Sequence, residues 1–120
     1  MLFKSYSRCD VKLIDFGSSC FVSDALSCYI QSRSYRAPEV VLGLAYGPKI
    51  DVWSLGCVLA ELLTGAVLFP NESQQSILAR IVALRGPFPP AMLDAGAESH
   101  KFFTADGRVY ERAEEGDTVR

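Results

Sequence analysis

The strongest hydrophobic pattern in the chain lies between Asp51 and Thr64. Apolar side chains occupy most of the circumference of the helix that this segment predicts, and Gly65 directly after it is a typical C-terminal stop. A helix that is apolar nearly all round is normally buried inside a larger body. The apolar positions are Val52, Trp53, Leu55, Val58, Leu59, Leu62 and Leu63.

Two further helices are predicted on either side of this segment. Ser73–Leu84 carries apolar residues at helical spacing, and the run Gly86–Pro90 ends that pattern. Pro38–Leu42 fits a short helix that begins at Pro38 and ends at Gly43.

The N-terminal part of the chain has a different pattern. Leu2-Phe3 and Val11–Ile14 are short apolar runs on either side of a polar stretch, which predicts two small strands joined by a turn. Gly17 breaks the second strand, and the small and polar residues of Ser18–Arg36 predict a long ordered loop, of a kind that is usually functional. Beyond Ala91 the apolar residues form short islands, and the last ten residues are expected to be weakly ordered. The predicted fold class is mainly α with a short β hairpin.

Length and composition limit the alternatives. With 120 residues, of which 49% are hydrophobic, the chain has enough apolar material for one domain. Its net charge of -2 creates no large field of either sign, so no nucleic acid or membrane partner is expected. The four cysteines lie far from each other and from the lone His100, without zinc-ligand spacing. No apolar run approaches the roughly 20 residues that a membrane-spanning helix needs, and the first residues do not resemble a signal peptide. We therefore expect an intracellular protein of the cytoplasm, the nucleus or both.

The triplet Asp15-Phe16-Gly17 has the chemistry of a divalent-cation site beside phosphate oxygens. The end of the predicted strand aims the Asp15 carboxylate, Phe16 anchors the turn in apolar surroundings, and Gly17 lets the backbone reverse. Three fixed residues occur by chance in many proteins. On this triplet alone, a solvated acid in a turn is the simpler interpretation.

Two later motifs favour the functional interpretation. Ala37-Pro38-Glu39 follows the loop, and Asp51–Gly56 opens the apolar helix. In this order and spacing the motifs resemble those of the protein kinases, and Ser32–Glu39 resembles the CMGC group of that family. Within this group, the chain is similar to the dual-specificity tyrosine-regulated kinases, with the plant and protist branch closest. That resemblance rests on Lys4–Cys9, Asp15–Cys20 and Tyr29–Arg33, and the overall similarity extends from Phe3 to about Arg112.

The resemblance implies roles for Asp15 and for the loop after it. Asp15 would coordinate magnesium on ATP, and Tyr29 would be the activation-loop tyrosine that the nascent kinase phosphorylates on itself. A phosphotyrosine carries about -1.5 to -2 charge and three strong acceptors, which Arg33 and Arg36 could clamp. The plain alternative is that the two arginines pair with nearby carboxylates. Family members commonly have a second tyrosine two residues before Tyr29, where this chain has Ser27.

The same resemblance implies a substrate shelf. Ser32 matches a hydroxyl next to the catalytic aspartate, and the loop around Ser34, Tyr35 and Arg36 would lie under the substrate residue that follows the phosphorylated one. Asp51 matches the acid that braces the catalytic loop from beneath. A favourable interaction of this acid with the dipole of its helix is compatible with that role.

Glu39 has a structural role in the implied fold. In the family it pairs with an arginine near the end of the domain, which would lie beyond Arg120. A buried carboxylate without its partner costs about 3–5 kcal/mol, and a whole domain is stable by only about 5–15 kcal/mol. The isolated chain is therefore expected to be marginally stable.

The resemblance implies that residues 1–120 form part of a protein kinase domain, with a partial kinase-like C-lobe of the α+β type. This part holds the magnesium loop, the activation segment, the motif helices, one further helix and the start of the CMGC insert, whereas the N-lobe and the catalytic loop would precede Met1. The expected activity is that of an ATP- and magnesium-dependent, dual-specificity serine/threonine kinase acting on protein hydroxyls. Phosphoryl transfer needs several electrostatic partners, so we expect the isolated chain to be inactive. The first alternative is a noncatalytic binding or decoy module derived from a kinase, and the second is a misfolded or never-expressed gene fragment.

Overall fold

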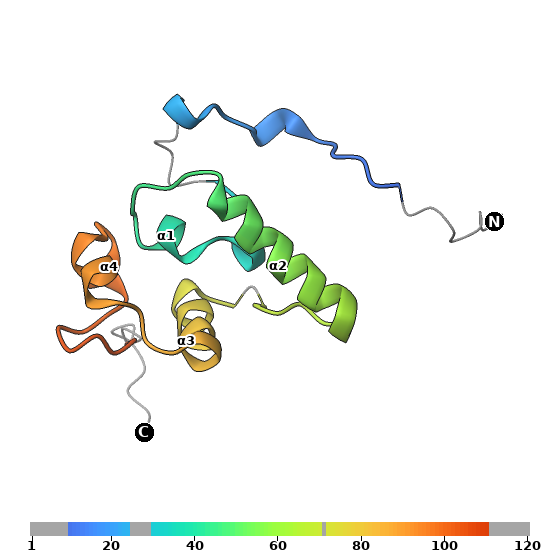
Figure 1. Ribbon diagram of the computed structural model, residues 1–120. Coiled ribbons are helices and arrows are strands. Elements are labelled where there is room, and N and C mark those ends of the chain that lie inside the picture. Colours follow the sequence, from blue (N-terminus) through green and yellow to red (C-terminus); the bar gives the residue numbers. More distant parts are fainter. Residues whose placement is uncertain (1–9, 25–29, 71, 111–120) are drawn as a thin grey trace, which may run out of the picture.

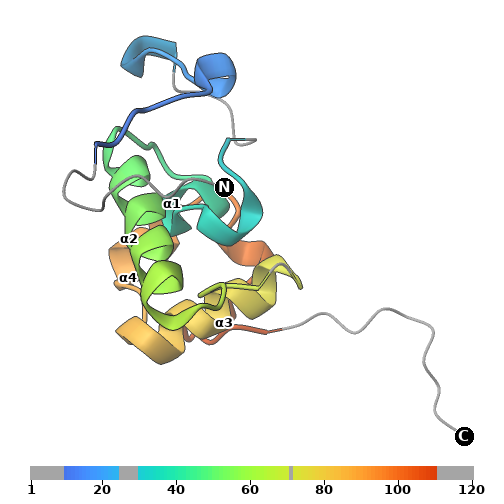
Figure 2. The same ribbon diagram turned by 90° about the vertical axis from the view of Figure 1, so that its right-hand side faces the viewer.

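The computed structural model describes residues 10–24, 30–70 and 72–110 of the 120-residue chain. In this part, α2 and α3 are the two long helices, and α3 runs across one side of α2 (Figures 1 and 2). Single turns of 3-10 helix occupy Phe16–Ser18, Val22–Asp24, Arg33–Tyr35 and Ser99–Lys101. The α-helices are α1 (Pro38–Val41), α2 (Lys49–Thr64), α3 (Gln74–Arg85) and α4 (Pro90–Ala95).

Helix α2 confirms the strongest prediction from the sequence, although it begins at Lys49 rather than Asp51. Pro48 precedes the first turn, with a φ of -57° that already suits a helix. At the other end Gly65 has a φ of 74°, and its N–H donates to the carbonyl of Glu61 at 2.8 Å. A side chain at this position would strain the backbone, so Gly65 is the residue that allows the helix to end here.

Helix α1 also forms as predicted, and a close packing contact determines where it ends. Pro38 is its first residue, and the N–H of Leu42 donates to the Pro38 carbonyl at 2.9 Å. Gly43 then has a φ of 70°, and a Cβ atom there would lie 2.9 Å from Cγ of Glu98. The Leu42 carbonyl accepts a hydrogen bond from the Glu98 N–H at 2.9 Å, so the end of α1 is fixed to the C-terminal part of the chain.

Helix α3 forms where the apolar spacing predicts a helix, while α4 was not predicted. Ser73 Oγ accepts a hydrogen bond from the Ser76 N–H at 3.0 Å, which makes Ser73 the N-cap. Gly86, with a φ of 87°, follows the last turn. The apolar pair Met92-Leu93, seen in the sequence as an isolated island, packs from α4 against the core.

The core consists of three clusters, and α3 contributes to two of them. Leu78 is fully buried against α1 and the C-terminal segment, whereas Ile77 and Ile81 pack on α2 and Phe69. Burying one such side chain contributes about 1.5–3 kcal/mol. The clusters are Val41, Leu42, Leu78, Phe102 and Phe103; Cys57, Phe69, Ile77 and Ile81; and Ala37, Val40 and Ile50.

The mainly helical fold class is confirmed, but the strand predicted at Val11–Ile14 does not form. This segment is irregular and its apolar side chains are exposed, with Leu13 84% and Ile14 81% accessible. Its predicted partner, Leu2-Phe3, lies outside the described residues, as do the last ten residues that were expected to be weakly ordered. A strand needs a neighbour for its backbone hydrogen bonds, and no described segment supplies one. In the described part, β pairing is limited to one bridge between Phe103 and Val109.

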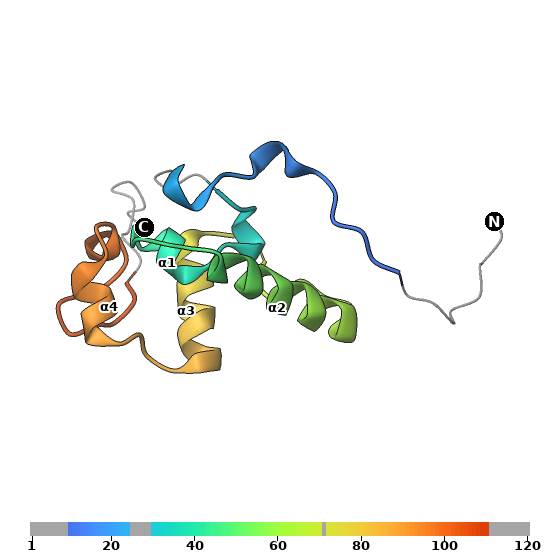
Figure 3. The ribbon, with the colours of Figure 1, turned by 45° about the horizontal axis from the view of Figure 1, so that its top comes forward.

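One face of α2 carries an apolar stripe that the described residues leave exposed. Among the described residues, only Ile50 and Cys57 of this helix are buried. The prediction that the helix is buried inside a larger body is not tested by these residues. The blue segment 10–24 runs apart from the helices (Figure 3). The side chains of the stripe are exposed. None of the described helices is long and apolar enough to span a membrane. The exposed apolar residues of the stripe are Val52, Leu55, Val58, Leu59, Leu62 and Leu63.

The 120-residue polypeptide, produced alone, is therefore expected to bind the hydrophobic dye ANS and to unfold without a sharp thermal transition. Replacing Leu59, Leu62 and Leu63 together by Gln should lower the dye fluorescence, because it removes half of the six apolar side chains of the stripe. Leu84→Gln, a single exposed site on α3, is the control and should change it little. A sharp transition with no dye binding would contradict this expectation.

Candidate functional site

The Asp15 loop is a tight turn with an unusual backbone conformation. Asp15 has φ 64° and ψ 66°, in the left-handed region that non-glycine residues rarely occupy. The turn Phe16–Ser18 follows, and both the N–H and the hydroxyl of Ser19 donate to the Phe16 carbonyl, at 3.0 and 2.6 Å. Residues held in such conformations concentrate at functional sites.

Two details of this turn differ from the sequence prediction. The positive φ falls on Asp15 and not on Gly17, where an added Cβ would make only an ordinary contact, 3.7 Å from Oδ1 of Asp15. The apolar surroundings predicted for Phe16 are not supplied by the described residues, because this side chain is 66% exposed. The sequence indicated a reversal here but could not show which residue makes it.

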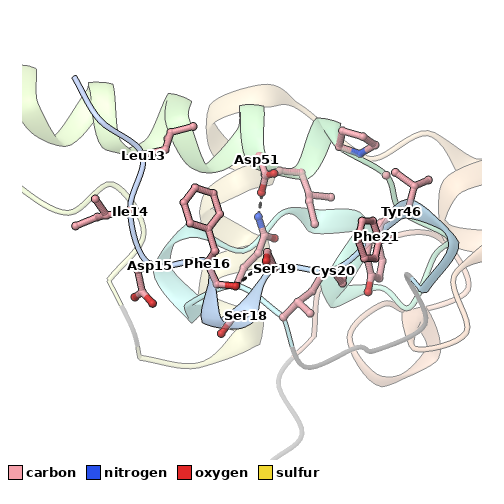
Figure 4. Close-up of a pocket in the computed structure, with 16 residues that line it drawn as sticks. Leu13, Ile14, Asp15, Phe16, Ser18, Ser19, Cys20, Phe21, Tyr46 and Asp51 are labelled. Carbon is pink, nitrogen blue, oxygen red and sulfur yellow. Dashed lines mark hydrogen bonds between the residues drawn. The ribbon is translucent and has the colours of Figure 1, made fainter. Parts of the chain in front are cut away.

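A hollow of about 500 Å³ separates the Asp15 loop from the start of α2. Asp15 and Phe16 line it on one side, Asp51 lines it on the other, and Ile30 and Gln31 from the following loop complete its wall. Figure 4 shows the Phe16 ring between the two carboxylates in that view. The predicted metal ligand and the loop that leads to the predicted substrate shelf therefore face one space.

The Asp15 carboxylate is suited to a hard cation. It is exposed, and carboxylate oxygens are the ligands that Mg²⁺ prefers. Among the described residues, no group of three His, Cys, Asp or Glu side chains could hold a metal by itself. Mg²⁺ usually binds through one or two carboxylates together with substrate phosphates and water, so a single acid fits this kind of site.

The predicted substrate shelf is joined to α2 by a hydrogen-bond network. The Gln31 amide nitrogen donates to the Ile50 carbonyl at 2.8 Å and to Ser54 Oγ at 2.7 Å. The Ser54 hydroxyl in turn donates to the Tyr35 carbonyl at 2.8 Å. On the other side, Gln31 Oε1 accepts from the Ala37 N–H at 2.9 Å. These bonds hold both ends of the segment from Gln31 to Ala37 against the first turns of α2.

Gln31 and Ser54 were not singled out from the sequence. Gln31 has a φ of 65°, so its backbone, like that of Asp15, is left-handed without being glycine. Both residues lie within motifs that carry the resemblance, Tyr29–Arg33 and Asp51–Gly56, but those motifs gave neither side chain a role of its own. The available signal was that a serine among apolar residues of a helix requires a polar partner.

The two predicted clamp arginines have different environments. Arg36 is partly buried, with Nε donating to the Ile30 carbonyl at 3.0 Å and Nη2 to the Gln31 carbonyl at 2.9 Å. Arg33 is exposed on the adjacent 3-10 turn. Tyr29 lies outside the described residues, as does Ser27. Arg36 thus binds the backbone of the two residues that directly follow Tyr29 in the chain.

Tyr35 connects the shelf to a later turn of α2. Its hydroxyl donates to Oε2 of Glu61 at 2.6 Å, and this hydrogen bond is the main reason why the pKa of Tyr35 is raised above its ordinary value. Partial burial and the negative charge of Glu61 raise the pKa further, because both disfavour a tyrosinate. Glu61 is a third site residue that the sequence did not reveal.

The remaining predicted residues lie around this network. Ser32 is exposed, and its carbonyl accepts from the Tyr35 N–H at 2.9 Å, while Ser34 is partly buried. Asp51 is exposed in the first turn of α2, where a negative charge is favourable. Glu39 is partly buried in α1 and forms no ion pair with any described residue.

The family model for the protein kinase domain matches residues 1–93. This is more than half of the 120 residues, and it includes the Asp15 loop, the shelf and helices α1 to α3. The chain therefore belongs to the protein kinase family.

Curated relatives narrow this assignment to one type of kinase. The dual specificity tyrosine-phosphorylation-regulated kinase mbk-2 of Caenorhabditis elegans is 51% identical over 107 residues, which are 89% of this chain and 13% of that protein. Dual specificity tyrosine-phosphorylation-regulated kinase 3 of Homo sapiens is 49% identical over 107 residues, 89% of this chain and 18% of that protein. The serine/threonine-protein kinase ppk5 of Schizosaccharomyces pombe is 49% identical over 100 residues, which are 83% of this chain and 12% of that protein.

These relatives confirm the predicted resemblance to the dual-specificity tyrosine-regulated kinases, while the plant and protist branch stays a prediction. The chain is of the dual-specificity tyrosine-regulated type, within the CMGC group of serine/threonine kinases. It spans less than a fifth of the length of the relatives named, at most 18%.

The hydrogen bond between Tyr35 and Glu61 gives a pH-dependent prediction. Because the pKa of Tyr35 is raised, the bond stabilises the fold fully below the ordinary tyrosine pKa of about 10 and ceases to do so as the pH rises through the raised value. Glu61→Gln removes the charge and should lower the pKa of Tyr35. An NMR titration of Cζ-labelled tyrosine in the full-length gene product measures this change.

Glu72→Gln is the matched control for that titration, because it is the same substitution at an exposed position. Glu72 Oε1 lies 3.7 Å from Nη2 of Arg80, a residue of α3. The control substitution should leave the Tyr35 titration unchanged. Equal titration curves for wild type and Glu61→Gln would show that the bond does not control the ionisation of Tyr35.

Proposed function

We propose that the full-length gene product is an ATP- and magnesium-dependent protein kinase that phosphorylates serine or threonine hydroxyls of proteins. In this proposal, residues 1–120 supply the magnesium loop and the activation segment of its catalytic domain. The observation that carries the proposal is the shared hollow, which Asp15 lines from one side and Ile30 and Gln31 line from another. A phosphate held near Asp15 and a peptide resting on the shelf would meet there.

The role of Asp15 follows from its chemistry. When bound, Mg²⁺ neutralises charge on the phosphate oxygens of ATP, which favours transfer of the terminal phosphoryl group. The left-handed backbone at Asp15 fixes the direction in which its side chain leaves the main chain. Other groups that a kinase requires lie outside these residues, and for that reason we propose that the 120-residue chain alone does not transfer phosphate.

The shelf is proposed to hold the protein substrate. Its backbone is fixed on α2 through Gln31 and Ser54, and the exposed Ser32 lies between the hollow and the 3-10 turn. Ser34 and Tyr35 form the part of the shelf that lies on α2. A rigid surface of this kind orients a peptide at a low cost in entropy.

Tyr29 is proposed to be an autophosphorylation site. Its phosphate would lie one residue before Ile30, whose carbonyl already binds Arg36, and close in sequence to the exposed Arg33. Two arginines can bind a phosphate through several charge-assisted hydrogen bonds. Arg33 and Arg36 would then order the loop, while Glu39 and Asp51 support the helices beneath it.

Asp15→Asn in the full-length gene product tests the proposed activity. This variant keeps the size of the side chain but removes the charge, so phosphate transfer from Mg-ATP to a protein substrate should fall by roughly a hundredfold or more. Labelling at Tyr29, followed by mass spectrometry, should disappear with it. Transfer of labelled phosphate to a basic protein measures the first effect.

Asp24→Asn, another exposed acid of the same segment, is the matched control and should keep its activity. A wild-type protein that transfers no phosphate would instead favour a noncatalytic binding module. Phosphate on the substrate but never on Tyr29 would refute the autophosphorylation step alone.

A further inference from the structure

We propose that the side-chain amide of Gln31 is a positioning residue for the protein substrate, because it holds the shelf in its working conformation. The proposal rests on the proposed kinase function and adds a residue to it. It concerns the carboxamide itself and is separate from the phosphate on Tyr29. None of its bonds requires a charge from that phosphate.

The Gln31 carboxamide makes three hydrogen bonds, through both N–H donors and the oxygen. Its oxygen accepts from the Ala37 N–H at 2.9 Å, and its nitrogen donates to the Ile50 carbonyl at 2.8 Å and to Ser54 Oγ at 2.7 Å. Two donated bonds and one accepted bond fix which end is oxygen, since a rotated amide would place oxygen against the Ile50 carbonyl. No other natural side chain of this length offers the same pattern.

The main chain of Gln31 has an unfavourable conformation that the hydrogen bonds of its side-chain amide can stabilise. A φ of 65° is sparsely populated for residues with a Cβ atom, so a loop left to itself would tend to relax away from it. In this conformation the Gln31 carbonyl accepts from Arg36 Nη2 at 2.9 Å. The side chain and the carbonyl of one residue thus bind α2 and Arg36 respectively, which sets the direction in which the chain enters Ser32.

Loss of the amide would act on the shelf and only weakly on the Asp15 loop. The network joins Gln31 to Ala37, Ile50 and Ser54, and no hydrogen bond among the described residues connects it to Asp15. Binding of the peptide should therefore suffer more than binding of ATP. A general loss of structure would impair both.

The experiment uses the full-length gene product with a peptide substrate and measures KM for the peptide and for ATP separately. Gln31→Met keeps the length of the side chain but makes none of the three bonds, and it should raise the peptide KM roughly tenfold or more while the ATP KM stays within about twofold. Gln75→Met, the same substitution on α3, is the matched control. An unchanged peptide KM in Gln31→Met would overturn the proposal.

Gln31→Gly separates the amide from the backbone conformation. Glycine adopts a φ of 65° without strain, so it would restore the shelf if the left-handed turn were all that mattered. We expect Gln31→Gly to have a raised peptide KM like Gln31→Met. A wild-type KM in Gln31→Gly would overturn the role of the side chain.

Hydrogen exchange provides a test that does not depend on activity. In Gln31→Met, exchange in the peptide that contains the Ala37 amide should accelerate roughly tenfold or more, with the protection of α2 retained. If that variant fails to fold, Gln31→Glu, which cannot donate to the Ile50 carbonyl, should raise the peptide KM in its place. A wild type without kinase activity would refute the proposed function. The exchange data would still decide whether the Gln31 amide holds the segment on α2. Unchanged exchange at Ala37 in Gln31→Met would refute that role of the amide.

Discussion

The Ser54 hydroxyl is the point on which the arrangement of the site depends. It accepts from the Gln31 amide and donates to the Tyr35 carbonyl, and so joins two separate parts of the shelf to one position on α2. Around it, Tyr35 reaches Glu61 two turns further along the helix, and Arg36 binds the carbonyls before the shelf. Each of these hydrogen bonds replaces a bond to water, so its net contribution to stability is modest. Together they favour a single conformation of the segment from Gln31 to Ala37.

Helix α2 can support the shelf because its polar residues bind the shelf while another of its faces packs on α3. Its polar positions, Ser54 and Glu61, face the shelf, and Cys57 packs with Ile77 and Ile81 of α3. The apolar stripe on another face stays exposed within the described residues. A contiguous apolar surface of this kind is covered by other protein segments in a stable domain. The site thus depends on a helix of which one face is packed and another is exposed among the described residues.

Much of the helical fold could be predicted, because α1, α2 and α3 each carry local signals: Pro38, Ser73 and the glycines at 43, 65 and 86. The candidate metal ligand also came from a motif, and the family from three motifs in order. Helix α4 and the irregular structure of Val11–Ile14 could not be predicted, because the structure of a short apolar run depends on the residues that pack against it. Gln31 and Glu61 were missed for a related reason, because their partners lie 19 and 26 positions away in the sequence and no local pattern records such contacts.

The central claim is that the Gln31 amide and the Ser54 hydroxyl act together to hold the segment on α2. A double-mutant cycle with Gln31→Ala, Ser54→Ala and the double variant tests it most directly, using the free energy of local opening at the Ala37 amide measured by native-state hydrogen exchange in the full-length gene product. Residues in one hydrogen-bond network show coupling energies of about 0.5–3 kcal/mol, and we expect a value in that range. Strictly additive effects, with coupling near zero, would contradict the claim.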